Sequence, residues 1–216
     1  MTRIDIKDVV ENLIDTFLNA GKISLDLRDK GLTKETKSDN TPVSNGDLEV
    51  NKIVTQKIKE LTPELPIISE ETSDNKSINN LENFWLIDPI DGTRAFSQHK
   101  PEWGVLVSRI VKNEISTGIV ICPVQDIYTA VHNNKLITSS FDYEQVEIAD
   151  KEDYLISCED NLDLLDVFSN EKVLFRNKNQ FCKDIISLGF STFDAVITSA
   201  PFAHDRLAYE PIAKYI

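Results

Sequence analysis

The residues most suggestive of chemistry are two carboxylates that directly follow an apolar run. The run of residues 84–87 (F-W-L-I) is typical of a buried strand, and Asp88 and Asp91 come next, with Pro89 between them. Because proline cannot donate to a strand ladder, we expect this strand to end at Asp88. Two acids at this point repel each other and resist desolvation, which a divalent cation with oxygen ligands would relieve. A polar turn after a strand is the equally weighted alternative for this pair alone.

A second apolar run upstream also ends in acids. Residues 66–68 (P-I-I) precede Ser69, Glu70 and Glu71. Two strands that both end in carboxylates predict a single acidic cluster at one edge of a sheet. Mg²⁺ is held by a few carboxylates together with water and substrate phosphate, so the cluster would suit this ion.

These motifs resemble those of a known enzyme family. The run W-L-I-D-P-I-D-G-T at residues 85–93, with I-S-E-E upstream, resembles the signature of the inositol monophosphatase superfamily, which comprises Mg²⁺-dependent, lithium-sensitive phosphomonoesterases. Residues 39–47 (D-N-T-P-V-S-N-G-D) are similar to the family's D-x-S-P-V-T-x-A-D segment. The run L-T-P-E-L-P-I-I-S-E-E at residues 61–71 is most similar to the CysQ-type 3′(2′),5′-bisphosphate nucleotidases. The resemblance covers residues 5–131, with a weaker match over 183–213.

The resemblance implies a site that holds two or three Mg²⁺ ions. One metal would be held by Glu70, Asp88 and the backbone carbonyl of Ile90, and a second by Asp88, Asp91 and Asp205. Glu70 would also contribute to a third and is counted with the catalytic residues, whereas Glu71 would lie outside the ligand set.

The resemblance also implies roles in binding phosphate and in orienting water. The backbone N–H groups of Gly92 and Thr93 would receive the substrate phosphate at a helix start. Asp47, together with Thr93, would orient the attacking water. From the residues alone, Ser44-x-x-Asp47 predicts the start of a helix, and Asp47 would then be a helix-start carboxylate with a structural role. Gly46 stands where the family usually has alanine.

Composition excludes several classes of function. The 216 residues carry a net charge of −13, which disfavours binding to a nucleic-acid polymer, and no apolar run is long enough to predict a membrane span. The N-terminus lacks a signal-peptide pattern, and three widely spaced cysteines favour reduced thiols in a cytoplasmic protein. A small phosphorylated substrate is the expected partner, and a homodimer is compatible with the sequence.

The predicted fold class is α/β of the α+β kind, a layered αβαβ(α) sandwich. Apolar spacing predicts an amphipathic helix over residues 4–28, with an interruption or bend at residues 19–21, and a second helix from Ser44. Residues 29–42 are expected to form a loop or hairpin. Strands over 103–111, 115–121, 127–131 and 136–137 predict an antiparallel meander.

We expect one domain over residues 1–216, with an α+β half over 1–138 and a smaller, shortened α/β half over 139–216. The second half is predicted to contain strands at 154–157, 173–175 and 193–197, helices at 162–168 and 183–189, and a final helix from residue 204. The other conspicuous side chains receive structural interpretations. His99 and His132 are expected to be exposed and His204 to pack, Trp85 and Trp103 to lie in the core, and Cys122, Cys158 and Cys182 to be buried thiols.

The leading functional hypothesis is a Mg²⁺-dependent phosphomonoesterase that hydrolyses 3′-phosphoadenosine 5′-phosphate to AMP. Residues 94–96 (R-A-F), where the nucleotidases often have K-E-F, weaken this substrate assignment. Inositol phosphate, histidinol phosphate or another sugar phosphate is the alternative within the same class. The alternative from another class is a metal- or phosphate-binding homologue without turnover, since the chain ends soon after Asp205 and has K-N-Q at 178–180 where the family has G-S.

Overall fold

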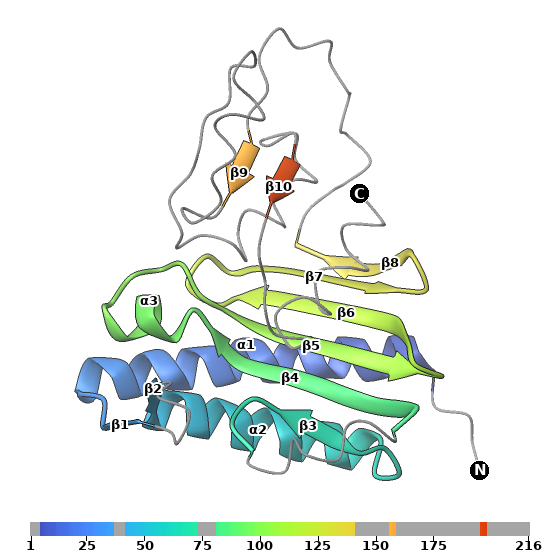
Figure 1. Cartoon of the computed structure of the whole chain (residues 1–216), viewed down its shortest axis with the longest axis horizontal. Helices are drawn as coiled ribbons and strands as arrows, with labels where there is room; N and C mark the ends of the chain where they lie inside the picture. The colour runs from blue at the N-terminus through green and yellow to red at the C-terminus, as the bar shows by residue number, and fades with distance from the viewer. Residues whose placement is uncertain (1–4, 37–41, 73–80, 141–155, 159–194, 198–216) are drawn as a thin grey trace, which may run out of the picture.

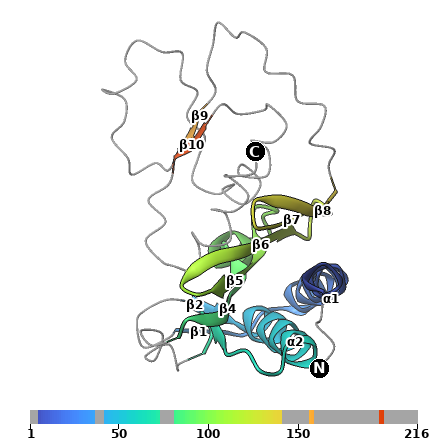
Figure 2. The ribbon, with the colours of Figure 1, turned by 90° about the vertical axis from the view of Figure 1, so that its right-hand side faces the viewer.

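Two helices cover one face of a six-stranded sheet (Figures 1 and 2). The computed structural model describes residues 5–36, 42–72, 81–140, 156–158 and 195–197. This helix-on-sheet arrangement confirms the predicted α+β class. Within these ranges, no helix is long and apolar enough to cross a membrane.

Both helices begin and end at the residue types that favour helix termini. Helix α1 spans Ile6–Lys30 and begins at Asp5, whose side chain accepts the N–H of Lys7 at 3.0 Å. It ends at Gly31, whose φ of 103° suits glycine. Helix α2 spans Asn45–Leu61, and Ser44 is its N-cap.

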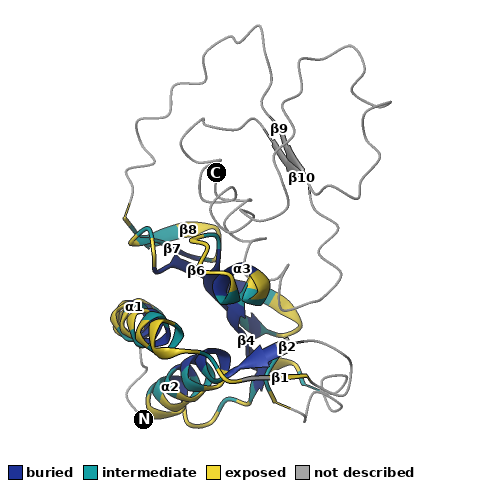
Figure 3. Ribbon diagram, turned by 90° about the vertical axis from the view of Figure 1, so that its left-hand side faces the viewer, coloured by how far each residue is buried: buried dark blue, intermediate teal, exposed yellow. Residues whose placement is uncertain are grey.

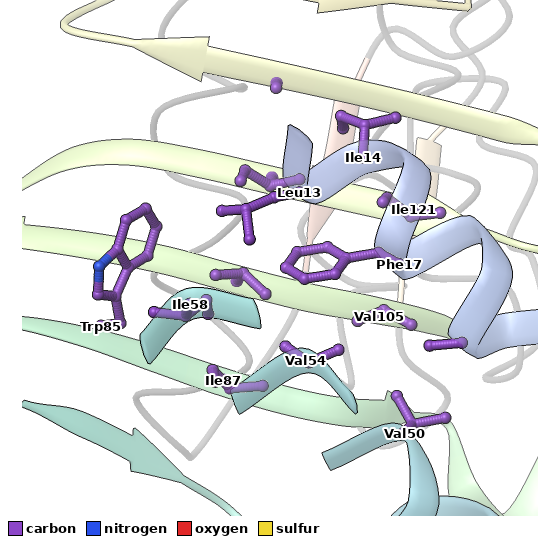
Figure 4. Packing of buried hydrophobic residues seen from close by; sticks show 14 of the residues in the cluster. Leu13, Ile14, Phe17, Val50, Val54, Ile58, Trp85, Ile87, Val105 and Ile121 are labelled. Carbon is purple, nitrogen blue, oxygen red and sulfur yellow. The ribbon is translucent and has the colours of Figure 1, made fainter. Parts of the chain in front are cut away.

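The helices bury their apolar stripes against the sheet (Figures 3 and 4). The core between the two layers includes Leu13, Phe17, Val50, Val54, Ile58, Trp85, Ile87, Val105 and Ile121. Burying apolar area of this kind contributes roughly 25 cal/mol per Å² and fixes how the helices lie on the strands.

The expected interruption at residues 19–21 is wrong, because α1 continues through them. Gly21 is buried, and a Cβ built on it would lie 2.3 Å from the Cγ and 2.4 Å from the Cβ of Pro123. The glycine therefore allows the helix to approach the turn after β6. Close packing, rather than a break in the helix, accounts for this residue.

The sheet is mixed but largely antiparallel, as predicted, and is not a doubly wound parallel sheet. Its strands lie in chain order, and only the β3–β4 pair is parallel. The strands are β3 (Ile67–Ser69), β4 (Asn83–Asp91), β5 (Gly104–Val111), β6 (Glu114–Cys122), β7 (Ile127–His132) and β8 (Lys135–Ser139). The predicted meander is thereby confirmed.

Two of the connections in the meander are two-residue turns. Lys112 and Asn113 have φ values of 54° and 63°, and Asn133 and Asn134 have φ values of 48° and 58°. Positive φ at both central residues matches the right-handed twist of the flanking strands. The segment between the helices also contains a hairpin, in which β1 (Lys34–Thr36) pairs antiparallel with β2 (Pro42–Ser44).

The prediction that the strand ends at Asp88 is wrong. Strand β4 continues through Pro89 to Asp91, but its pairing with β5 is irregular between Asp88, which faces Leu106, and Asp91, which faces Gly104. Proline is tolerated at such a point because the ladder needs no N–H from it. The strand therefore carries both acids, separated by an irregular segment.

His99 and His132 differ in how far they are exposed. His99 is exposed as predicted, with 61% of its side chain accessible. His132 contradicts the prediction of exposure, because it is half-buried: its Nδ1 lies 2.8 Å from the Oγ1 of Thr117 and its Nε2 lies 3.0 Å from the Nδ2 of Asn133. Burial, together with the nearby charge of Arg109, lowers the pKa of His132.

The remaining structural assignments are confirmed where the structure describes them. Trp85 and Trp103 are buried, and the Nε1 of Trp85 donates to the Oγ1 of Thr62 at 3.0 Å. Cys122 is a buried free thiol. Strands β9 (Ile156–Cys158) and β10 (Ala195–Ile197) form a parallel pair near two of the strands expected in the second half.

The other elements expected in the second half lie outside the described residues, as do Asp205, His204 and Cys182. The side chain of Cys158 is not described. The division into two halves therefore stays a prediction.

The contact between Gly21 and Pro123 gives a test of this packing. Gly21→Ala should lower the free energy of unfolding by about 1–3 kcal/mol, because the added methyl group overpacks the junction. Urea denaturation measures the change. In a Pro123→Gly background the same substitution should become stabilising, since alanine is favoured in a helix by about 1 kcal/mol. Destabilisation of similar size in both backgrounds would show that Pro123 is not the obstacle.

Candidate functional site

The parallel pairing of β3 with β4 brings two of the predicted acids, Glu70 and Asp88, to the same level of the sheet. Ser69 is in register with Ile87, and the N–H of Glu70 donates to the carbonyl of Ile87 at 3.1 Å. Glu70, which directly follows β3, therefore lies at the same level as Asp88, which directly follows Ile87 in β4. Parallel strands bring their carboxyl ends to the same edge, so the shared edge follows from the pairing.

Asp88 is the most buried of these acids, with 3% of its surface exposed. Its Oδ1 accepts the N–H of Ile90 at 3.1 Å, which fixes the carboxylate across the irregular segment of β4. Glu70 and Asp91 are half-buried. An acid buried this deeply requires compensation of its charge, and its oxygen atoms match the ligand preference of Mg²⁺.

The ligand set proposed from the sequence is only partly described. In the described ranges, no three His, Cys, Asp or Glu side chains form a group that could hold a metal ion by themselves. The fourth expected acid, Asp205, lies outside those ranges, and the expected carbonyl ligand of Ile90 is a backbone atom. The donor types fit a hard cation, and the complete ligand set stays a prediction.

A glycine in the left-handed conformation ends the acidic strand. Gly92 has φ 89° and ψ 34°, and it precedes the short helix α3 (Thr93–Ser97), which confirms the expected helix start. A Cβ at this position would lie 2.9 Å from the carbonyl oxygen of Glu102 and 3.3 Å from the Cα of Trp103. Both the backbone conformation and the close approach of the chain therefore require glycine here.

Asp47 connects the start of α2 to the start of α3. Its Oδ2 accepts the N–H of Ser44 at 2.8 Å and the hydroxyl of Ser44 at 2.5 Å, in a capping box. Its Oδ1 accepts the Oγ1 hydroxyl of Thr93 at 3.2 Å. The carboxylate therefore caps a helix with one oxygen and holds the Thr93 hydroxyl with the other, so the structural and functional interpretations are compatible.

The Thr93 hydroxyl has two acceptors within reach but only one hydrogen. Besides Asp47, the carbonyl oxygen of Ile90 lies 3.1 Å from its Oγ1. A hydroxyl donates one hydrogen bond and accepts two. When Thr93 donates to Asp47, its lone pairs and the Ile90 carbonyl are both available for other partners.

Burial has the largest effect on the pKa of Asp47. The residue is fully buried, and desolvation raises the pKa of its carboxyl group, while hydrogen bonds from Ser44 and Thr93 partly offset the increase. A carboxylate with a raised pKa accepts a proton more readily than an exposed aspartate.

Sequence reasoning missed one residue beside this pair. Phe96 of α3 is fully buried and contacts Gly46, directly before Asp47. The available signal was the glycine that stands where alanine is usual, because a missing methyl group leaves room for another side chain.

Known proteins match this chain in sequence. A model of the inositol monophosphatase family matches residues 5–199. The 3′(2′),5′-bisphosphate nucleotidase CysQ of Aggregatibacter actinomycetemcomitans is 34% identical over 121 residues, which are 54% of this chain and 44% of the relative. CysQ of Buchnera aphidicola is 32% identical over 146 residues, which are 62% of this chain and 55% of the relative. This chain therefore spans about half the length of the curated relatives it matches.

Solved structures share the fold. An inositol monophosphatase (IMPase) of Thermotoga maritima superposes with a TM-score of 0.79 at 19% identity, over 96% of this chain and 83% of the other. An IMPase/NADP phosphatase complexed with Mg²⁺ and phosphate superposes with a TM-score of 0.80 at 21% identity, over 98% of this chain and 82% of the other. At these identities the similarity shows a common fold.

The acidic edge predicts that Mg²⁺ stabilises the folded chain. An ion that binds only the folded state stabilises it by about 2.7 kcal/mol at one hundred times its dissociation constant. Differential scanning calorimetry should therefore show that the melting temperature rises with the Mg²⁺ concentration. Asp88→Asn should abolish the increase, because it removes the acid expected to bind both ions, while Asp26→Asn, at an exposed acid of α1, should preserve it. Equal melting temperatures with and without Mg²⁺ would contradict the metal site.

Proposed function

This chain belongs to the inositol monophosphatase family, and we propose that it hydrolyses a small phosphomonoester with the help of bound Mg²⁺. The observation that carries the proposal is the contact between the Thr93 hydroxyl and the Asp47 carboxylate, 3.2 Å apart and next to the acidic end of β4. These two residues lie 46 positions apart in the chain, so their meeting requires the tertiary fold. A hydroxyl held by a buried carboxylate can orient water.

The proposed ligands of the metal ions are those expected from the sequence. Glu70, Asp88 and the carbonyl of Ile90 would hold one Mg²⁺, Asp88, Asp91 and Asp205 a second, and Glu70 would contribute to a third. When bound, the metal lowers the pKa of water and stabilises the charge on the leaving oxygen. Because Asp88 is buried and its Oδ1 is held by the N–H of Ile90, little reorganisation of this ligand would be needed.

The residues of the chain itself position the nucleophile and move a proton. Thr93 donates its hydrogen to the Oδ1 of Asp47, so its lone pairs are left to accept a hydrogen bond from water. Asp47 then serves as the final proton acceptor through Thr93, a role that its raised pKa favours. The two bonds from Ser44 hold the carboxylate in place while the proton moves.

The phosphate would be received at the turn after the acidic strand. The left-handed Gly92 lets the backbone approach a ligand without a side chain, and the N–H groups of Gly92 and Thr93 would donate to the phosphate oxygens.

We favour 3′-phosphoadenosine 5′-phosphate as the substrate and AMP as the product, because two matching relatives are named 3′(2′),5′-bisphosphate nucleotidases. The IMPase names of the structural neighbours support inositol phosphate, histidinol phosphate or another sugar phosphate as the alternative. A homologue that binds metal or phosphate without turnover is the alternative from another class. The cytoplasmic location and the homodimer stay predictions.

A panel of phosphomonoesters tests the proposal. Phosphate release from 3′-phosphoadenosine 5′-phosphate, inositol 1-phosphate, histidinol phosphate and p-nitrophenyl phosphate should require Mg²⁺ and be highest for the first. The Asp88→Asn variant is the control for contaminating phosphatases and should be inactive. Greater turnover of another member would correct the substrate, and Mg²⁺ binding with no turnover on the whole panel would favour the non-catalytic alternative.

Asp47→Asn should separate water activation from metal binding. Asparagine can retain the Ser44 bonds through its oxygen, but its amide would donate to Thr93, which turns the Thr93 hydrogen toward the Ile90 carbonyl. We expect kcat to fall by about 10²–10⁴, while the Mg²⁺ affinity and the melting temperature change little. Steady-state kinetics, Mg²⁺ titration and calorimetry on the same variant measure these quantities.

The matched control for this substitution is Glu49→Gln on the same helix. Glu49 forms an ion pair with Lys52 at 3.3 Å, whereas the acceptors beside the Thr93 hydroxyl are Asp47 and the carbonyl of Ile90. The control should leave kcat unchanged. If Asp47→Asn keeps normal kcat and only lowers the melting temperature, Asp47 has a capping role alone.

A further inference from the structure

Phe96 is buried in the same turn of helix that carries Thr93. It lies three residues after Thr93 in α3, is fully buried, and donates its N–H to the carbonyl of Gly92 at 3.0 Å. Helix α3 has five residues. An isolated helix of this length is not stable in water, so its position depends on packing.

The ring of Phe96 lies against Gly46. A Cβ built on Gly46 would lie 2.7 Å from the Cε1 and 2.8 Å from the Cζ of Phe96. Gly46 is not among the glycines with positive φ, so its backbone conformation would accept alanine. The ring, and not the backbone conformation, is therefore the main obstacle to a side chain at this position, and the Oγ of Ser44, 3.2 Å from the built Cβ, is a looser neighbour.

Two further side chains fix the ring. Trp103 packs against it edge-on, with ring centroids 5.0 Å apart and planes inclined by 70°. The guanidinium of Arg28, near the end of α1, lies 5.7 Å from the ring centroid. Edge-to-face aromatic pairs and cation–π contacts are both attractive, so these two neighbours hold the ring in place. Phe96 is thus held by residues from α1, from the start of α2 and from the position directly before β5.

We propose that Phe96, seated on Gly46, is a positioning residue that sets the separation between the Thr93 hydroxyl and the Asp47 carboxylate. Gly46 directly precedes Asp47, and Phe96 belongs to the same short helix as Thr93, so the distance between the two helix starts is set where the ring meets the glycine. The catalytic consequence rests on the proposed phosphatase function. The absence of one methyl group at position 46 thereby controls the alignment of the water-orienting pair.

Gly46→Ala tests the inference directly. The methyl group should displace the ring, move Thr93 away from Asp47 and lower kcat by about ten- to a hundredfold, because misplacement by about 1 Å costs up to about 10²-fold in rate. Gly21→Ala is the matched control: it makes the same change in α1 and meets a comparable obstacle at Pro123, but it should leave kcat unchanged.

A second substitution tests whether the ring of Phe96 is the obstacle to the new methyl group. Leucine at position 96 lacks the ring atoms that the new methyl group would meet. Gly46→Ala should therefore lower kcat in the wild-type background and change it much less in a Phe96→Leu background. If the two effects on kcat are additive, the ring is not the element that couples the residues.

A readout independent of turnover completes the test. The hydrogen bond from Thr93 lowers the pKa of Asp47, so its loss should raise that pKa further. ¹³C NMR titration of the Asp47 carboxyl group in metal-free protein should show this increase in Gly46→Ala but not in Gly21→Ala. An unchanged pKa in Gly46→Ala would overturn the inference. If the wild type hydrolyses no substrate, the proposed function fails, and the titration still decides whether Phe96 positions the pair.

Discussion

The candidate site depends on the hydrogen bonds that the buried carboxylate of Asp47 accepts. A fully buried acid is costly unless its oxygens are bonded, and here Ser44 satisfies one oxygen and Thr93 the other. The same bonds that pay this desolvation cost also join α2 to the segment that follows the acidic strand. Stability and the alignment of the site are therefore consequences of one set of hydrogen bonds.

The layers of the fold make this meeting possible. The apolar stripes of α1 and α2 fix both helices on one face of the sheet, and the start of α2 then lies next to the end of β4 (Figure 1). Glycines at three positions permit the close approaches: Gly21 at Pro123, Gly46 at Phe96 and Gly92 at Glu102. Each contact involves a different pair of segments, so the geometry of the site relies on tight packing across the whole layer.

The sequence predicted the elements well and their contacts less well. Periodicity identified both helices and the meander, since one buried face imposes a strong pattern. It failed at Gly21 and Pro89, where a local preference was overruled: a close contact explains the glycine, and an irregular strand pairing tolerates the proline. The family resemblance pointed to Asp47 and Thr93, but only the fold showed Phe96 beside them, because packing between distant segments leaves little local signal.

The connectivity of the sheet has a consequence for how the chain folds. Strands β5 to β8 join neighbours in sequence, and two of their connections are tight turns that close at little entropic cost. The contact between Asp47 and Thr93, in contrast, spans 46 residues and needs the helix layer to be docked. Proteins rich in local contacts fold faster than those that depend on distant ones. The meander is therefore the part of the sheet that we expect to form early, and the contact between Asp47 and Thr93 the part that we expect to form late.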